Sequence, residues 1–307
     1  MLGDGGGWQA LNHRVRRAVC WQCSVWDMTW QFSDQVQTYA RRTWPLLAAA
    51  PARNTIALTV IENVRAGHRW SSEAMTFGWF TAGELAVGAI CMTPPYELLL
   101  AEVPASAIEP LVDALLARGT AVTGVNGEAA DAKAFAAAWT ARRPARAVSR
   151  RQERLYQLGT LLPARPAAGR PRPGHTADLP TAVDWFTRFH IEAGVHLVDV
   201  EPTVRDRVDN QLLWLWEDED GQPVSMAGRN KTAAGVARVG PVYTPIEHRR
   251  RGYGAAVTEA CTRDALERDA QHVVLFTDLS NPTSNGIYQQ IGYRPLRDHL
   301  VIDFEEL

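Results

Sequence analysis

The sequence predicts an α/β protein of two domains, each built as a twisted mixed β-sheet flanked by helices. Three observations carry this prediction. The chain has 307 residues, about twice the ~150 residues of an ordinary domain. Strand-like runs alternate with amphipathic helical segments through most of its length. A proline-rich stretch, residues 163–173, separates two such alternating halves and has the composition of a stiff linker.

Residues 1–27 differ from the rest of the chain. Four glycines occur among the first seven residues, and arginine and tryptophan follow without a helical or strand period. We therefore expect a leader without regular structure, and Met28 offers an alternative start. Cys20 and Cys23 lie in this leader with C-x-x-C spacing. No strand precedes them and no second pair of ligands lies nearby, so we interpret the spacing as chance.

The first predicted domain covers residues 28–162. Residues 34–67 read as helical, with Asp34 as a cap, an interruption at Pro45, and a second segment capped by Asn54. Three strand-like runs, a helix, a short strand, an alanine-rich helix and late strands follow. Their expected positions are 76–81, 86–92, 98–103, 106–118, 121–125, 129–142 and 145–162.

The second predicted domain covers residues 174–307. Thr176 or Asp178 can cap a helix that reaches about His190, with Pro180 tolerated in its first turn. A second helix, a hairpin, a strand, a helix, a buried strand, a helix and a last strand follow. Their expected positions are 202–210, 212–217 with 224–231, 235–244, 252–268, 272–277, 282–291 and 300–304.

Charge and composition exclude several classes of function. The 32 basic and 34 acidic residues leave a formal net charge of −2, which argues against a surface that coats nucleic acid. No apolar run approaches the ~20 residues that span a bilayer, so we expect no membrane partner. Four cysteines are too few for a disulfide scaffold and fit a reducing compartment. We therefore expect a cytoplasmic protein, and we expect no metal site.

The loop between the strand at 235–244 and the following helix carries the first chemical signal. It reads Arg249-Arg250-Arg251-Gly252-Tyr253-Gly254. A helix N-terminus offers unpaired amides and partial positive charge, glycine lets a phosphate approach the backbone, and arginine adds charged donors. The spacing is neither that of a P-loop nor that of a dinucleotide-binding turn. Taken alone, the loop fits an arginine-rich solvated turn equally well.

A second motif lies downstream at a fixed distance. The spacing Arg249-x-x-Gly252-x-Gly254 resembles the acetyl-CoA loop of the GNAT superfamily of N-acetyltransferases, and the stretch from Asn281 to Tyr293 resembles the second motif of that family. The resemblance covers residues 170–304. More narrowly, VYTPIEHRRRGYG and DLSNPTSNGIYQQIGYRP are similar to two-domain bacterial acetyltransferases whose N-terminal half is a degenerate GNAT-like domain.

This resemblance implies a cofactor site and a catalytic acid. The strand ending at Thr244 would splay from the strand ending at Thr277, and the pantetheine arm of acetyl-CoA would lie in the gap. The hydroxyl of Tyr288 would protonate the departing thiolate, although a tyrosine at this position can also simply pack in the core. The implied cofactor-binding residues are Val242, Tyr243, Thr244, Arg249, Arg250, Arg251, Gly252, Tyr253, Gly254, Ala255, Asn281, Ser284 and Tyr288.

The general base has no strong signal. Some family members use a glutamate on the strand before the loop, but the matching stretch Ala237-Arg238-Val239 has no carboxylate. We choose Glu192 as the base, because its segment forms the acceptor wall in the family. A lone glutamate, however, is often only a surface residue. The alternatives are His190, Asp278 and the hydroxyl of Tyr243. Four aromatic residues would line the acceptor pocket or the core: Trp185, Phe189, Trp214 and Trp216.

The first half lacks the arginine–glycine loop before its helix at Ser106, so we expect it to pack, to form a homodimer or to shape the acceptor site. The sequence thus predicts an acetyl-CoA-dependent N-acetyltransferase that acts on a primary amine of a small molecule or peptide. One alternative is a non-catalytic acyl-CoA-binding or regulatory module. Another is RNA binding through Arg249–Arg251 and the arginines of residues 142–154.

Overall fold

The computed structural model describes residues 28–195 and 200–307, so the predicted leader with Cys20 and Cys23 lies outside the described residues. Twelve strands of the described chain form one mixed sheet. They are β1 (Trp30–Ser33), β2 (Thr76–Ala82), β3 (Leu85–Met92), β4 (Leu98–Glu102), β5 (Gly124–Glu128), β6 (Ala145–Leu158), β7 (Arg170–Pro173), β8 (Leu213–Glu217), β9 (Pro223–Arg229), β10 (Val236–Tyr243), β11 (His272–Asp278) and β12 (Tyr293–Glu306). Their order across the sheet is β1-β2-β3-β4-β5-β12-β6-β11-β10-β9-β8-β7.

Helices cover both faces of this sheet, which confirms the predicted α/β class. In the first half (residues 28–162) they are α2 (Val36–Ala48), α3 (Thr55–Arg65), α4 (Ala105–Ala117) and α5 (Ala129–Thr140). In the second half (residues 174–307) they are α6 (Leu179–Ala193), α7 (Val200–Asp209), α8 (Tyr253–Arg268) and α9 (Pro282–Gln290), with short 3-10 turns at Thr176–Asp178 and Ile246–His248.

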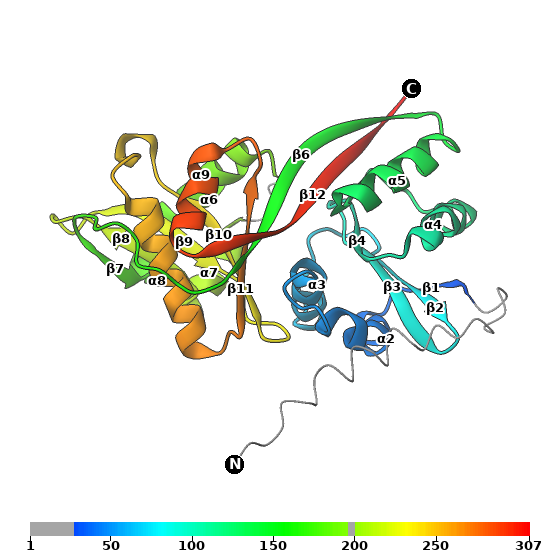
Figure 1. Ribbon diagram of the computed structural model, residues 1–307, viewed down its shortest axis with the longest axis horizontal. Coiled ribbons are helices and arrows are strands. Elements are labelled where there is room, and N and C mark those ends of the chain that lie inside the picture. Colours follow the sequence, from blue (N-terminus) through cyan, green and yellow to red (C-terminus); the bar gives the residue numbers. More distant parts are fainter. Residues whose placement is uncertain (1–27, 196–199) are drawn as a thin grey trace, which may run out of the picture.

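The two halves exchange strands. β6 comes from the first half yet pairs antiparallel with β11, from Gln157 opposite Val274 to Glu153 opposite Asp278. The last strand, β12, lies between β5 and β6 and pairs with both. Figure 1 shows β6 and β12 as two long strands that run side by side from one half of the molecule to the other. Each half therefore contributes one strand that pairs with strands of the other half. The division of the chain into domains at residues 28–162 and 174–307 remains a prediction.

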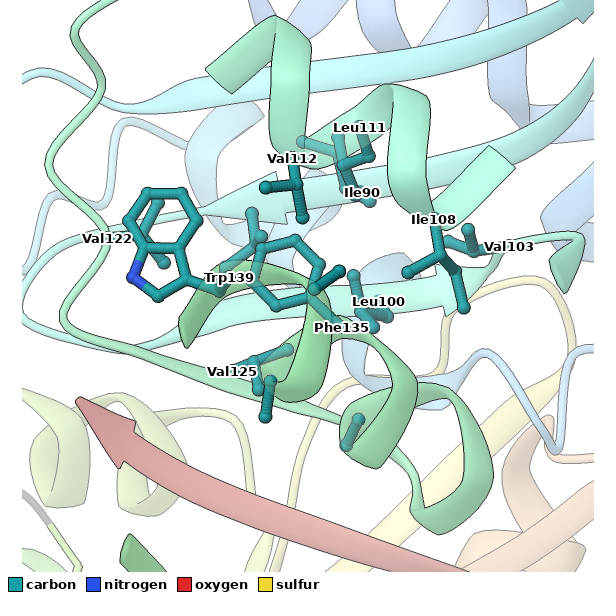
Figure 2. Close-up of a cluster of buried hydrophobic side chains, with 14 of the residues drawn as sticks. Ile90, Leu100, Val103, Ile108, Leu111, Val112, Val122, Val125, Phe135 and Trp139 are labelled. Atoms are coloured by element: carbon teal, nitrogen blue, oxygen red, sulfur yellow. The ribbon is translucent and has the colours of Figure 1, made fainter. Parts of the chain in front are cut away.

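Two apolar layers hold the first half together. On one face α4 and α5 pack against β3, β4 and β5; Phe135 and Trp139 of α5 stack with ring centroids 5.9 Å apart, inside the cluster shown in Figure 2. On the other face α2 and α3 bury Leu58 and Ile61 in a cluster that also contains Val274 of the second half. Because this second layer spans both halves, it fixes them against each other.

The sequence prediction differs from the structure at several places. Gln35, and not the predicted Asp34, is the N-cap of α2. Helix α2 continues through Pro45, where an interruption was predicted. Pro45 is exposed, so water can bind the carbonyl group that loses its intrahelical hydrogen bond. The buried Leu47 holds the next turn in the core. The edge strand β1 has only four residues and was not predicted. β7 lies at the end of the predicted linker, and its prolines are tolerated because it is also an edge strand. β12 is longer than the predicted strand at 300–304.

Candidate active site

The parallel strands β10 and β11 separate halfway along their length. They pair from Val236 opposite His272 to Val239 opposite Leu275, and then the pairing ends although both strands continue. A β-bulge in β10 against β9, between Val239 and Val242, turns the strand at this point. This is the divergence of strands that the family resemblance implies.

The diverging part of β10 leaves one backbone edge open. On one side Val242 and Tyr243 pair with Ala227 and Met226 of β9. On the side of β11 no strand within the described residues pairs with them. A strand edge of this kind binds an extended ligand through main-chain hydrogen bonds, as an added strand would.

The N-terminus of α8 lies beside the end of β10. Gly252 caps the helix with φ of +87°, a left-handed conformation that suits glycine. The amides of Tyr253, Gly254 and Ala255 have no intrahelical acceptor by their position. A Cβ atom on Gly254 would lie 3.3 Å from the Thr244 Oγ1, so glycine lets the helix end approach the strand end. This geometry fits a phosphate group.

The three arginines of the loop have different environments. The Arg249 Nε donates to the Thr244 carbonyl oxygen at 2.8 Å, and its guanidinium lies over the Tyr243 ring at 5.8 Å. Arg250 and Arg251 are exposed, and Arg250 has a φ of +63°, which is uncommon for a residue with a side chain. Two of the three side chains therefore extend into solvent, while Arg249 supports the end of β10.

Glu192, at the end of α6, joins this group. Its carboxylate accepts a hydrogen bond from the Tyr243 hydroxyl at 3.1 Å and pairs with the Arg249 guanidinium at 2.8 Å. Burial, together with the Glu192 carboxylate, raises the pKa of Tyr243. The side chain of Glu192 is 52% exposed, so the structure brings Glu192, Tyr243 and Arg249 together at the outer surface of the site.

Tyr288 lies in the core beneath the second motif. It is 8% exposed, and its ring meets Tyr293 edge to face with centroids 6.2 Å apart. Burial raises the pKa of Tyr288 to about 12, so the phenol stays protonated at neutral pH. The Asn281 Oδ1 accepts from the Ser284 amide at 3.0 Å and caps α9, the helix that carries Tyr288.

A side chain from β6 fixes the position of α9. The Tyr156 hydroxyl donates to the Asn285 Oδ1 at 2.9 Å and accepts from the Gln289 Nε2 at 3.1 Å. Sequence reasoning missed Tyr156, because it lies more than a hundred residues before α9 and belongs to the first half. Pairing of β6 with β11 brings it to the site.

A cavity of about 420 Å³ lies between the two halves, next to the point where the strands diverge. Gly240 and Pro241 of β10, Phe276 of β11 and His190 of α6 line it from the second half. The first half contributes α3, the β3–β4 turn and β6. Of the four aromatic residues singled out in the sequence, Phe189 lines the cavity. The others lie in the apolar clusters of the second half: Trp185, Trp214 and Trp216.

His190 is the titratable candidate that faces this cavity, whereas Glu192 is not among the lining residues. The His190 Nδ1 lies 2.7 Å from the Phe186 carbonyl oxygen. Because a carbonyl oxygen can only accept, Nδ1 carries the hydrogen and Nε2 is the nitrogen that can take up a proton. Burial lowers the pKa of His190, and the charges of Arg207 and Arg151 lower it further.

Several charged residues that line the cavity escaped the sequence reasoning. Among them are Arg207 of α7, Arg238 of β10 and Glu153 of β6. One signal was visible, since Arg238 interrupts an apolar strand between Ala237 and Val239. In contrast, six of the arginines considered for RNA binding have acidic partners: Arg142, Arg146, Arg150, Arg151, Arg154 and Arg249.

Comparison with solved structures shows that this chain has the fold of tandem GNAT proteins. Residues 220–302 match the family model described as FR47-like protein. A GCN5-related N-acetyltransferase from Sphaerobacter thermophilus aligns with a TM-score of 0.59 and 14% identity over 90% of this chain and 95% of that one. The resemblance to the GNAT superfamily is therefore confirmed at the level of the fold.

Two further solved structures support the tandem arrangement. A tandem GNAT protein from the clavulanic acid biosynthesis pathway aligns with a TM-score of 0.54 and 13% identity over 90% of this chain and 98% of that one. A Drosophila protein aligns with a TM-score of 0.60 and 13% identity over the same shares of the two chains. No sequence match to a curated protein was found.

Two features are absent from residues 28–195 and 200–307. None of their helices combines the length and apolar character that crossing a membrane requires. They also contain no group of three or more histidine, cysteine or acidic side chains that could hold a metal ion.

Proposed function

We propose that the protein is an acetyl-CoA-dependent N-acetyltransferase whose active site lies in the second half. The divergence of β10 from β11 after Val239 and Leu275 carries the proposal. This divergence leaves one backbone edge of β10 open. The N-terminus of α8 and the cavity both lie next to this open edge. An extended thioester bound at that edge would reach the cavity with its acyl end.

The residues present fit acetyl-CoA. Main-chain groups from Val242 to Thr244 would pair with the pantetheine amides, and the first amides of α8 would bind the pyrophosphate. Arg250 and Arg251 would add charged donors from the solvent side. Bound there, acetyl-CoA supplies an acetyl group activated as a thioester. Glycine at position 254 leaves room for the pyrophosphate at the start of α8, since a Cβ atom there would crowd Thr244.

Direct transfer needs two proton movements. The nitrogen of the amine bonds to the carbonyl carbon, the carbon–sulfur bond breaks, and the sulfur takes up a proton. Tyr288 is protonated at neutral pH and would donate that proton. A base takes the proton that the amine loses. Backbone donors near Val242 would stabilise the negative charge on the carbonyl oxygen.

His190 is the base that the cavity favours. Its Nδ1 is held by the Phe186 carbonyl oxygen and its pKa is lowered, so Nε2 is free of a proton at neutral pH. Glu192 keeps its place as the sequence-derived candidate. Its carboxylate is engaged by Arg249 and Tyr243 and is half exposed, which suits a residue that positions the end of β10 better than a base.

The test of the proposal is a thiol-release assay with the full chain, acetyl-CoA and a panel of primary amines, together with calorimetry of acetyl-CoA binding. We expect binding and release of free thiol that depends on an amine. Absence of acetyl-CoA binding would refute the proposal.

A second candidate function is a non-catalytic acyl-CoA-binding or regulatory module. One observation favours it: Arg238 occupies the strand before the loop, where some relatives have a catalytic glutamate. Acetyl-CoA binding without thiol release on any amine of the panel would support this candidate over the enzyme.

A further inference from the structure

Four arginines line the cavity between the halves, Arg229 and three others. Arg151 comes from β6, Arg207 from α7 and Arg238 from β10. Arg207 and Arg238 lie close enough for the charge of one to lower the pKa of the other, and both Arg207 and Arg151 act on His190 in the same way. The cavity therefore concentrates positive charge beside the proposed base.

The carboxylates of the cavity wall are already engaged. Glu153 pairs with Arg151 at 3.0 Å, Asp206 pairs with Lys231 at 2.8 Å, and Glu97 pairs with Arg150. Arg229, which also lines the cavity, is paired with Asp264 at 3.0 Å. After these pairs are assigned, two arginines of the cavity lining remain without a carboxylate partner.

Arg207 and Arg238 form no ion pair with a carboxylate in the part of the chain that the structure describes. The Arg207 Nη1 donates to the Thr203 carbonyl oxygen at 3.2 Å, while its Nε is buried without an acceptor. The Arg238 Nη1 donates only weakly, to the Thr55 Oγ1 at 3.4 Å. Burial lowers the pKa of each guanidinium to about 10, so both remain charged at neutral pH.

Arg207 lies at the point where the strands diverge. A Cβ atom on Gly228 would lie 3.3 Å from the Cδ and Nε of Arg207 and 3.5 Å from the Gly240 carbonyl oxygen. The guanidinium stem thus packs on Gly228, next to the bulge at Gly240. Phe186 lies under the guanidinium at 5.1 Å. Glycine at 228 and the aromatic ring together hold Arg207 beside the proposed place of acetyl transfer.

Arg207 and Arg238 are partly buried, and a partly buried charge without an anionic partner carries a cost, because the protein around it does not replace the hydration that it loses. A ligand anion would remove this cost, and guanidinium groups bind carboxylate and phosphate through paired hydrogen bonds. We propose that the acceptor amine carries an anionic group, a carboxylate or a phosphate, which Arg207 and Arg238 bind in the cavity. The statement that the anion is part of an acceptor rests on the proposed function. The existence of an anion site does not depend on it.

The test is calorimetry of small probes against the full chain saturated with CoA, so that the loop before α8 is already occupied. The probes are 2-aminoethyl phosphate, β-alanine and ethanolamine, which keeps the amine but carries a neutral hydroxyl in place of the anionic group. We expect one of the two anionic probes to bind at least about 10-fold more tightly than ethanolamine, since a charge-assisted hydrogen bond contributes a factor of about 10 to 100. Which of the two binds better distinguishes phosphate from carboxylate.

The variants Arg207→Gln and Arg238→Gln should each weaken binding of the preferred anion by about 10- to 100-fold. The matched control Arg143→Gln removes an exposed arginine of the first half and should leave binding unchanged. The melting temperature of neither cavity variant should be lower than that of the wild type, because each substitution removes a charge that has no carboxylate partner. If a variant does unfold, the melting temperature of the wild type at constant ionic strength provides the readout, and it should rise with the preferred anion.

Equal binding of ethanolamine and the two probes that carry an anionic group, or unchanged binding in both cavity variants, would overturn the anion site. Thiol release separates this result from a failure of the proposed function. Anion binding without acetyl-CoA binding would leave the site standing and refute the transferase. Thiol release that is equal for ethanolamine and both anionic amines, and unaffected by Arg207→Gln, would leave the transferase standing and refute the inference.

Discussion

Replacing Tyr288 with phenylalanine isolates the proposed proton donor from its packing. The ring is 8% exposed and contacts Tyr293 in the core, and phenylalanine keeps that ring. The phenol, with a pKa raised to about 12, is protonated throughout the assay range. Loss of a general acid costs a factor of about 10² to 10⁴ in turnover, equivalent to about 3 to 5 kcal/mol of transition-state stabilisation. We expect Tyr288→Phe to lower kcat by this factor.

The assay is steady-state thiol release at saturating amine, with calorimetry of acetyl-CoA binding. Acetyl-CoA affinity should change by less than about threefold, because the hydroxyl acts on the leaving group and not on the bound ground state. Tyr293→Phe is the matched control, since its hydroxyl only bonds to the Thr262 hydroxyl at 2.7 Å in the same core. That control should lose about 1 kcal/mol of stability and keep its kcat. Unchanged kcat in Tyr288→Phe would mean that Tyr288 only packs.

Four further predictions concern the base and the framework. His190→Gln should lower kcat/KM by about 10² to 10⁴, with Glu192→Gln much milder; the reverse order would restore Glu192 as the base. Because the base acts when neutral and its pKa is lowered, kcat/KM in the wild type should fall only below pH 6.5, and a fall that begins above pH 7 would contradict this role. Asp264→Ala should cost about 3 to 5 kcal/mol in urea unfolding, since it strands the buried guanidinium of Arg229. Tyr156→Phe should cost about 1 to 3 kcal/mol in the same measurement and reduce kcat less than Tyr288→Phe; a larger kcat effect would place Tyr156 in the chemistry.

The conformation of the loop before α8 was predictable because its signals are local. Glycine with a left-handed φ at position 252, glycine again at 254 and a helix start follow from a few neighbouring residues. The order of helices and strands was predictable for the same reason, since each element has its own period. Pro45 was misjudged because a proline on the exposed face of a packed helix is tolerated when the next turn is anchored.

The cavity was not predictable, because it depends on pairing across the two halves. Nothing local shows that β12 inserts between β5 and β6, or that β6 places Glu153 opposite Asp278. Whether Arg207 faces solvent or a cavity depends on the first half packing over it. Glu192 was chosen from the family's acceptor wall, but its side chain meets Arg249 at the outer surface, whereas His190, two residues earlier on the helix, lines the cavity.

The central claim is that the diverging strands and the N-terminus of α8 bind acetyl-CoA. Calorimetry of acetyl-CoA against the wild type, Gly254→Val and the control Gly286→Ala tests it most directly. A side chain at 254 would crowd the Thr244 hydroxyl, whereas a Cβ atom at 286 meets nothing within 4 Å. We predict one site per chain in the wild type and in Gly286→Ala, and affinity at least about 10-fold weaker in Gly254→Val. Equal affinity in all three proteins would contradict the claim.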